Sequence, residues 1–319
     1  MATTESQKRL TVGTVTYRRT DICLETIEKL LRVITPRDEL VVVEQGGNEV
    51  EAVCDQRWPG RVIFYNLEKP SMTGARNHLI QYARGQVVLF VDDDVGPSPT
   101  LLEGHWAAYA DPRIGGVAGR ILSPRSNGTA PAVVGDFWPE TNFEATVPAG
   151  VPHARGCNMS YRREVLLAIG GYDTGFKPPF FFREDSDVGF RVRAAGYRIR
   201  FVPEAELLHL EAKTGGARGA TEQVSAIAAE IRAYKKNYAH YRDSLYFLFK
   251  HFHGKELRQW VWYTYRNNVG ISRYPWRLAA KNYYFFKALY RARRDSTANP
   301  PPYFQSSSET KKPASVAGL

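Results

Sequence analysis

The sequence lacks the features that mark secreted, membrane-spanning and zinc-finger proteins. Its three cysteines, Cys23, Cys54 and Cys157, have no paired or metal-ligand spacing, which argues against a disulfide framework. No stretch approaches the roughly 20 apolar residues of a membrane-spanning helix. The first ten residues, MATTESQKRL, lack the apolar core of a secretory signal. We therefore expect a cytoplasmic protein whose thiols are buried or incidental, and we find no internal repeat.

The basic charge of the chain is concentrated near its C-terminal end. Lys and Arg outnumber Asp and Glu by ten over all 319 residues, but residues 250–294 alone carry eleven basic residues and one acidic residue, Glu256. Because this local excess equals the net charge of the chain, the remaining residues are close to neutral. Hydrophobic residues make up 43% of the chain, which is enough for a sizeable core. We therefore assign chemistry and basic charge to different parts of the molecule.

Short apolar runs alternate with helical patterns in the first half of the chain. Strands are predicted at residues 10–17, 39–45, 61–65 and 87–91. The helices between them include one capped by Asp21 and one over residues 74–83 capped by Ser71 or Thr73. This alternation predicts βαβ units, and hence an α/β fold with a mainly parallel sheet. Later strands are predicted at 115–122, 154–161 and 198–203, and later helices at 163–169, 185–195 and 222–238.

Polar residues follow three of these buried strands at the point where each strand ends. They are Tyr17, Glu44-Gln45 and Asp92-Asp93-Asp94. Because ligands bind beyond the carboxyl ends of the strands in such sheets, we expect these residues to face one crevice. A divalent cation such as Mg²⁺ or Mn²⁺ would relieve the repulsion among three adjacent carboxylates and would share its shell with phosphates. The alternative for the three aspartates is a solvated acidic turn.

A second acidic cluster, Glu184, Asp185 and Asp187, lies at the start of a predicted helix. The helix dipole stabilises acidic residues there, and this reading suffices for Asp187. Glu184 and Asp185 follow an aromatic, proline-rich stretch, PPFFFRED. An apolar wall raises the pKa of a carboxyl group and suits it to act as a general base. The cluster is therefore a second candidate for chemistry.

Three further features carry both a structural and a functional interpretation. His209 lies in an apolar segment, so it is either a core residue or a metal ligand. The loop Lys213–Gly219 (KTGGARG) is either a flexible connector or a lid over a diphosphate. Arg76 lies near a helix N-terminus, where the dipole disfavours a cation, so we expect a phosphate or an acidic partner beside it.

Taken together, these motifs resemble the family 2 glycosyltransferases with the GT-A fold, from about Leu10 to Glu211. VGTVTYRR and VVVEQGGN resemble the two strands whose ends contact the nucleotide, although Gln45 stands where the family usually has a second acid. GARN followed by VVLFVDDDV is similar to the A-R-N helix and the D-x-D metal motif. GCNMSYRREVLLAIGGYDTGF resembles the acceptor-side segment, and REDSDVGFRVRAAGYRI resembles the E-D motif with its helix.

The resemblance implies a GT-A type, nucleotide-sugar-binding sheet that is mixed, mainly parallel and flanked by helices. It implies that a sugar is transferred from a nucleotide-sugar, with UDP as the expected nucleotide, to a glycan or lipid-linked acceptor. The expected transfer is inverting and non-processive, as in polysaccharide and cell-envelope biosynthesis. The Q-x-x-R-W motif of processive synthases is absent. The order of motifs is also similar to that of galactofuranosyl- and rhamnosyltransferases, without singling out a sugar.

The same resemblance assigns roles to residues. Asp185, with Glu184 beside it, is the catalytic base, and Asp92, Asp94 and His209 hold Mn²⁺ or Mg²⁺. The acceptor side is expected within residues 123–183, with Trp138, Asn158 and Arg183 as candidates. The expected nucleotide-sugar contacts are Thr16, Tyr17, Glu44, Gln45, Arg76, Asp92 and Asp93.

The segment 250–294 mixes its cations with many aromatic residues. This combination suits a membrane interface with anionic lipids, and it would place the protein at the inner face of the membrane. The alternatives are a helical appendage packed on the catalytic domain or on a second subunit of a homo-oligomer. We expect no nucleic-acid partner, because no nucleic-acid motif is present. The aromatic residues are Trp260, Trp262, Tyr263, Tyr265, Trp276, Tyr283, Tyr284, Phe285, Phe286 and Tyr290.

We divide the chain into a catalytic domain (1–220), a helical extension (221–295) and a polar, proline-rich tail (296–319) that we expect to be disordered. Three other functions stay open on the sequence alone. One is a catalytically inactive sugar- or lipid-binding protein, another a nucleotidyltransferase of the same fold, and the third a nucleic-acid-binding protein driven by the basic segment.

Overall fold

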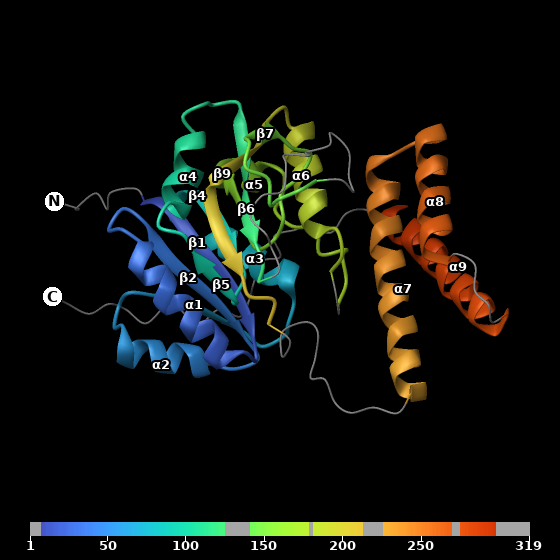
Figure 1. Ribbon diagram of the computed structural model, residues 1–319, viewed down its shortest axis with the longest axis horizontal. Helices are drawn as coiled ribbons and strands as arrows, with labels where there is room; N and C mark the ends of the chain where they lie inside the picture. The colour runs from blue at the N-terminus through green and yellow to red at the C-terminus, as the bar shows by residue number, and fades with distance from the viewer. Residues whose placement is uncertain (1–7, 125–140, 179–180, 213–225, 270–274, 298–319) are drawn as a thin grey trace.

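The computed structural model describes residues 8–124, 141–178, 181–212, 226–269 and 275–297. These residues form an α/β body and a separate unit of three helices on one side of it (Figure 1). The predicted boundary at 220, the loop 213–219 and the tail beyond 297 lie outside the described residues. None of the described helices is long and apolar enough to cross a membrane.

The first half of the body alternates strands and helices, as the sequence predicts. Strand β1 pairs in parallel with β2 and with β4, and β2 pairs in parallel with β3. Every residue of β2 is buried, because β2 has a strand on either side and is covered on both faces. The elements are β1 (Lys8–Tyr17), α1 (Thr20–Val33), β2 (Glu39–Gln45), α2 (Glu49–Arg57), β3 (Ile63–Leu67), α3 (Met72–Tyr82) and β4 (Gly85–Val91).

The second half of the body adds antiparallel strands to the same sheet. The strand order is β3-β2-β1-β4-β8-β6-β9-β5, with β7 paired to β9. Strand β8 runs antiparallel to both β4 and β6, whereas β6 and β9 are parallel, so the sheet is mixed. The elements are β5 (Val95–Pro97), α4 (Leu101–Ala108), β6 (Ile114–Leu122), β7 (Ala149–Gly150), β8 (Asn158–Arg162), α5 (Arg163–Ala168), α6 (Glu184–Ala194) and β9 (Arg198–His209).

Strand β9 is longer than the sequence predicts. We expected it to end at Pro203, but it continues to His209. The pairing with β6 shifts register between Gly119 and Arg120, whose partners are Val202 and Glu206, so Pro203 falls in an irregularity that needs no ladder hydrogen bond from it. Strand β8 is shorter than predicted, because it begins only at Asn158.

The helix N-termini show which predicted caps form. The Ser71 side chain accepts a hydrogen bond from the Gly74 N–H, so Ser71 caps α3 as predicted. Such a cap stabilises a helix by about 1 kcal/mol. Asp21 is not a cap, because α1 begins one residue earlier, and it lies instead in the first turn.

The C-terminal unit consists of three helices, where the sequence predicts a helix at 222–238 and helical pieces after it. They are α7 (Ala226–His251), α8 (Gly254–Val269) and α9 (Pro275–Thr297). Helix α7 therefore extends well beyond the predicted end. Gly254, at a φ of +56° that favours glycine, stands at the start of α8. Residues 296 and 297 are still helical, so the expected disorder does not begin at 296.

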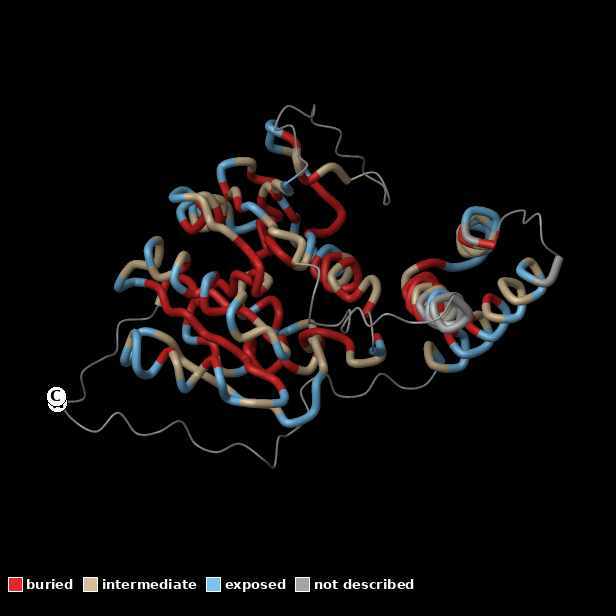
Figure 2. The backbone as a smooth tube through the Cα atoms, turned by 60° about the horizontal axis from the view of Figure 1, so that its bottom comes forward, coloured by how far each residue is buried: buried red, intermediate tan, exposed pale blue. Residues whose placement is uncertain are grey.

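Two apolar cores hold these units (Figure 2). The larger one fills both faces of the sheet and includes Cys23, Cys54 and Cys157, which are buried and free, as expected. The smaller one joins α7, α8 and α9 to Phe176 and Phe181 of the body. Several rings of the basic segment thus pack inside the protein, which confirms the helical appendage without excluding a membrane contact for the exposed rings.

Candidate active site

The predicted crevice lies at the carboxyl edge of the parallel strands. Thr16 and Tyr17 of β1 pair with Glu44 and Gln45 of β2, and β4 ends beside β1 at Val91. The three polar strand ends therefore share one edge, as the α/β alternation predicts. On the other side, Val95 of β5 pairs with His209, the last residue of β9. This pairing brings residues that lie more than a hundred positions apart to the same place.

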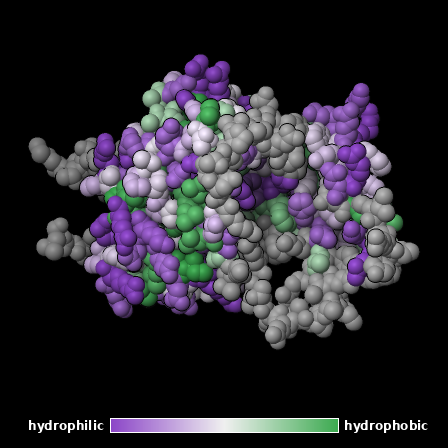
Figure 3. All heavy atoms as spheres, in the orientation of Figure 1, coloured by the Kyte–Doolittle hydropathy of each residue, from purple (hydrophilic) through white to green (hydrophobic). Residues whose placement is uncertain are grey.

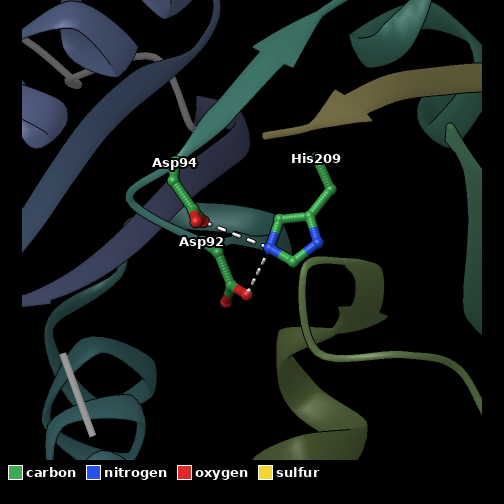
Figure 4. Close-up of side chains that lie close together, drawn as sticks. All are labelled: Asp92, Asp94 and His209. Carbon is green, nitrogen blue, oxygen red and sulfur yellow. Dashed lines mark ion pairs between the residues drawn. The ribbon is translucent and has the colours of Figure 1, made fainter. Parts of the chain in front are cut away.

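Asp92, Asp94 and His209 converge on one point (Figure 4). The His209 Nε2 atom lies 3.2 Å from Asp94 Oδ1 and 3.6 Å from Asp92 Oδ2. Both aspartates follow β4, and the β5–β9 pairing supplies the histidine. An octahedral ion with bonds of about 2.1 Å holds neighbouring ligand atoms about 3 Å apart. The three side chains therefore fit a divalent cation.

The surroundings shift the pKa of each of these three side chains. Burial raises the pKa of Asp92, against the opposing effects of Arg76 and His209. Burial alone would raise the pKa of Asp94 too, but hydrogen bonds from His209 and the Ala212 N–H outweigh it and the pKa is lowered. The hydrogen bond with Asp94 raises the pKa of His209.

Asp93 points away from this cluster. Its carboxylate accepts a hydrogen bond from the Thr16 hydroxyl at 2.7 Å and pairs with Arg19 at 2.8 Å. Thr16 and Asp93 thus contact each other at the strand end, and their nucleotide contacts stay a prediction. Arg19 also lies 3.8 Å from Asp94 and 3.4 Å from the Ala212 carbonyl oxygen. The sequence analysis did not predict a role for Arg19, although a pair of arginines directly after a strand end, as in TYRRTD, could have indicated a partner for the aspartates.

Glu44 and Gln45 shape the neighbouring part of the crevice. Glu44 is 3% exposed, and its two carboxylate oxygens accept from the Val50 and Glu51 N–H groups at the start of α2. Gln45 accepts from the Ser71 N–H at 2.6 Å and so fixes the loop before α3. Tyr17 is only partly buried, with the Arg18 guanidinium 5.2 Å from the centre of its ring. Tyr17 is therefore more accessible than Glu44 and Gln45, which are both buried.

Glu184 and Asp185 form the first turn of α6, and the protein treats them differently. Glu184 is buried, and its pKa is raised to about 8 by burial and the nearby Asp185, against the effect of Arg76. Asp185 is more exposed, and its Oδ2 accepts from the Gly156 N–H at 3.1 Å. Its Oδ1 accepts from the Ser186 N–H at 2.7 Å. Asp185 is therefore held by two backbone N–H groups and is more accessible than Glu184.

Arg76 has the acidic partner that its position predicts. Its guanidinium is buried, lies 3.2 Å from Glu184 Oε1 and 4.0 Å from Asp92 Oδ1, and so connects the metal cluster with the acidic helix. Gly156 lies between these groups, since a Cβ there would come within 2.8 Å of Arg76 Nη2. A glycine at 156 lets the backbone reach both Arg76 and Asp185.

The backbone leading into α6 is strained. Phe181 and Arg183 adopt left-handed φ angles of +47° and +75°, which are uncommon for residues other than glycine. Burial lowers the pKa of Arg183 to about 10, against the effects of Asp185 and Glu184. Such conformations persist where the surrounding structure holds them, and they concentrate at functional sites.

The acceptor-side candidates differ in their placement. Asn158 is fully buried, and its amide donates to the carbonyl oxygens of Arg120 and Ala205 while His105 contacts its Oδ1 at 2.8 Å. Asn158 therefore joins neighbouring strands through its amide, and its role as an acceptor contact stays a prediction. Arg183 lies beside the acidic pair, whereas Trp138 lies outside the described residues. His153, buried near Asp185, carried no sequence signal, because only the fold brings the two together.

Comparisons with known proteins agree with this geometry. The model of the glycosyltransferase-like family 2 matches residues 8–230, which is more than half of the chain. The chain belongs to this family. The match covers the three polar strand ends, including the aspartates after β4, and also the acidic helix α6 and His209.

Two curated relatives have glycosyltransferase names. The chain is 33% identical over 93 residues to an N-acetylglucosaminyl-diphospho-decaprenol L-rhamnosyltransferase of Mycobacterium tuberculosis, a match that covers 27% of this chain and 29% of the relative. It is 26% identical over 175 residues to a glucosyl-dolichyl phosphate glucuronosyltransferase of Haloferax volcanii, covering 51% and 55%. The matches thus span about a third to a half of the relatives' lengths.

Two solved structures share the GT-A fold. A mannosyltransferase from Pyrobaculum calidifontis, in complex with GDP-mannose and Mn²⁺, has a TM-score of 0.51 at 19% identity and covers 94% of this chain and 78% of its own. GalNAc-T7 with UDP, GalNAc and Mn²⁺ has a TM-score of 0.56 at 16% identity, covering 74% and 51%. The GT-A fold predicted from the sequence motifs is confirmed.

Proposed function

We propose that this protein is a metal-dependent, inverting glycosyltransferase that moves one sugar, or a few, from a nucleoside-diphosphate sugar to the hydroxyl of a glycan or lipid-linked acceptor. The observation that carries the proposal is the proximity of two sets of carboxylates. Asp92, Asp94 and His209 form the first set. Asp185 belongs to the second set, which Arg76 connects to the first through its contacts with Asp92 and Glu184.

The ligand set favours Mn²⁺ over Mg²⁺. Carboxylates bind either ion, but imidazole nitrogen is a softer ligand than Mg²⁺ prefers. Once bound, the ion would supply positive charge that stabilises the leaving nucleoside diphosphate. Asp92, Asp94 and His209 would hold it, and Arg19 keeps Asp94 oriented from the opposite side.

The remaining steps rest on residues of the chain itself. Asp185 takes the proton of the acceptor hydroxyl as that oxygen forms a bond to the anomeric carbon, while the bond from that carbon to the diphosphate oxygen breaks. The Gly156 and Ser186 N–H groups hold the Asp185 carboxylate for this step. A single displacement inverts the anomeric configuration. Tyr17 is the candidate to contact the base of the donor, for which UDP is the first nucleotide to test.

A lipid-linked acceptor is supported by two observations. The two relatives above are named for substrates linked to decaprenyl diphosphate and dolichyl phosphate. The second observation is a surface, which we call the α8–α9 face and define by Trp262, Tyr283, Phe286 and Tyr290. These rings are 62%, 60%, 56% and 68% exposed, and they are the most exposed large apolar side chains among the described residues.

The α8–α9 face is continuous across the two helices. Tyr283, Phe286 and Tyr290 are three and four residues apart on α9, so they share one side of it. Trp262 stacks on Tyr265 at 5.6 Å, and Tyr265 lies 6.2 Å from Phe286.

Cations border these rings. Lys287 is exposed and lies 5.5 Å from the Tyr283 ring centre, and Arg266 is exposed on α8. Figure 3 shows hydrophilic residues over much of this unit. Exposed aromatic rings beside cations fit the headgroup region of an anionic membrane, where a lipid-linked acceptor would be found. We therefore place the protein at the cytoplasmic surface of a membrane.

The proposal is tested by offering the purified protein a panel of nucleotide-sugars with Mn²⁺ and measuring the nucleoside diphosphate released, with and without a polyprenyl-diphosphate sugar. Release from one donor that depends on the acceptor is the expected result. Asp185→Asn should lower this rate about 10³-fold while nucleotide binding persists. If nucleotide-sugars bind but no nucleoside diphosphate is released from any of them, the inactive sugar- or lipid-binding alternative would be favoured. Normal turnover by Asp185→Asn would refute the assignment of Asp185 as the catalytic base.

A further inference from the structure

The loop that delivers the acidic helix is held from outside the body. Its described parts are residues 173–178, which begin at the aspartate of the GGYD motif, and residues 181–183, which lead into the first turn of α6 with Glu184 and Asp185. Helix α7 of the C-terminal unit lies on that side of the body (Figure 1). Its side chains contact the beginning and the end of this loop, and the contacts are charged and buried.

Lys250 is the central contact. Its ammonium nitrogen lies 2.6 Å from Asp173 Oδ2, at the beginning of the loop, and 2.5 Å from Asp187 Oδ1, in the first turn of α6. The side chains of both aspartates are 0% exposed and that of Lys250 is 16% exposed. One cation thus bridges two buried carboxylates that the fold brings together from the two ends of the loop.

The other hydrogen bonds of the two carboxylates are satisfied as well. Asp173 also accepts from the Tyr246 hydroxyl at 2.9 Å, and Asp187 also contacts His251 Nε2 at 2.8 Å. Arg191 pairs with the second oxygen of Asp187 at 2.8 Å. Among these partners of Asp173 and Asp187, Arg191 belongs to the body, whereas Tyr246, Lys250 and His251 belong to α7. Among the residues that the structure describes, the cation paired with Asp173 is Lys250 of α7.

Two neighbouring residues of α7 hold the middle of the same loop. Arg242 donates to the Gly175 carbonyl oxygen at 2.6 Å, and Asp243 accepts from the Phe182 N–H at 3.1 Å. Phe182 stands between the two residues with left-handed φ angles, Phe181 and Arg183. Contacts from α7 thus hold the strained backbone that leads directly into Glu184 and Asp185.

We propose that Lys250 is a positioning residue for the transfer reaction, because its bridge between Asp173 and Asp187 fixes the first turn of α6 and with it the Asp185 carboxylate. The inference rests on the proposed function, in which Asp185 is the base. It gives the C-terminal helices a second task besides the membrane contact, since without them the acidic helix would lose its anchor. A displacement of about 1 Å at a reacting group costs on the order of 100-fold in rate.

The test compares Lys250→Met, which keeps the length and removes the charge, with Lys250→Arg, which keeps the charge. Lys250→Met should lower kcat about 10- to 100-fold while the KM for the donor and the affinity for UDP with Mn²⁺ stay within about twofold. The metal cluster should be unaffected because β4 and β9 hold it. Lys250→Arg should recover most of kcat. The Asp173→Asn/Lys250→Met double variant should lose less than the product of the two single losses.

Two controls separate positioning from a general weakening of the helical unit. Phe285→Leu removes packing from the core of that unit without touching the bridge, because Phe285 packs on Tyr241 and Tyr265. It should keep kcat near the wild-type value even when its melting temperature falls as far as that of Lys250→Met. Lys255→Met changes an exposed lysine of α8 and should change neither kcat nor the melting temperature.

Hydrogen–deuterium exchange tests the bridge without relying on activity. In Lys250→Met, amides of residues 181–190 should exchange at least about tenfold faster than in the wild type, with β4 unchanged. Unchanged exchange there would overturn the inference, as would a kcat loss matched by Phe285→Leu or a parallel loss of UDP affinity. If the wild type transfers no sugar but the exchange result holds, the proposed function has failed and the anchoring of α6 by Lys250 has not.

Discussion

The crevice and the α8–α9 face both contain charged and aromatic side chains, but the protein treats these groups in opposite ways. In the crevice, charged groups are buried and paired inside the body, as Arg19 is with Asp93. On the α8–α9 face, rings such as Tyr290 and cations such as Lys287 are exposed. The first arrangement suits a small charged ligand held in one geometry, whereas the second suits a broad surface. The variants below should affect one region and spare the other.

The largest expected effect is at the metal cluster. His209→Ala removes the nitrogen ligand, so the Mn²⁺-dependent affinity for nucleoside diphosphate should fall by about 100-fold or more, because loss of even an indirect contact to a metal site costs 10- to 100-fold. Calorimetric titration of UDP with Mn²⁺ measures this. The control is His253→Ala, an exposed histidine between α7 and α8. Equal losses in the two variants would contradict the assignment, and liposome binding should be unchanged in both.

The reciprocal variant changes the α8–α9 face. Trp262→Ala/Phe286→Ala removes two exposed rings, and binding to vesicles containing anionic phosphatidylglycerol should fall about tenfold or more, since each buried ring contributes about 1.5–3 kcal/mol. Co-sedimentation measures this. Leu167→Ala, which removes an exposed apolar residue of α5, serves as control. Undiminished vesicle binding by the double variant would refute the membrane contact, while UDP affinity should stay at the wild-type value.

A smaller effect concerns pH and the buried Glu184. Its pKa is raised to about 8, so its protonated form is favoured in the folded state, and its contribution to stability is present at acid pH and is lost as the pH rises from about 4.5 through about 8. Glu184→Gln removes this slope. The stability of the variant relative to the wild type should therefore increase between pH 5 and pH 8.5, measured by urea unfolding. Parallel profiles would show that Glu184 does not titrate in this range.

The smallest effect is expected at the cap of α3. Ser71→Ala should lower the free energy of unfolding by about 1 kcal/mol, whereas Ser71→Asp should retain most of it, because a carboxylate also accepts from the Gly74 N–H. Denaturant unfolding measures both variants. An unchanged midpoint in Ser71→Ala would show that the cap contributes nothing measurable.

The sequence was sufficient for the parts of the site that depend on chain order. Apolar runs ending at Tyr17, Gln45 and Val91 predict strands, and parallel strands ending in polar residues predict a crevice at their common edge. The GT-A fold followed from motifs that lie in order along the chain. An acidic or phosphate partner for Arg76 was predictable because a cation near a helix N-terminus needs one.

Other parts depend on contacts between distant residues, which local patterns do not reveal. The end of β9 was misplaced because Pro203 normally stops a strand, and only the register shift with β6 accommodates it. The hydrogen bonds that the Val50 and Glu51 N–H groups donate to Glu44 were not foreseen from the sequence, because they form only where α2 folds over the end of β2. In the sequence, Lys250 is one of many cations in the basic segment 250–294. Only the fold shows that it lies between the buried carboxylates of Asp173 and Asp187.

The most direct test of the central claim is a melting-temperature measurement with UDP, GDP and dTDP, each with Mn²⁺ and with EDTA, on the wild type and on Asp94→Asn. At about 100 times its Kd a ligand adds about 2.7 kcal/mol to the stability of the folded state, which corresponds to a shift of several degrees. We predict that at least one nucleotide raises the melting temperature of the wild type with Mn²⁺ only, and that Asp94→Asn abolishes this shift. Equal stabilisation in EDTA, or a full shift in Asp94→Asn, would contradict the claim that this crevice holds its nucleotide through a metal ion.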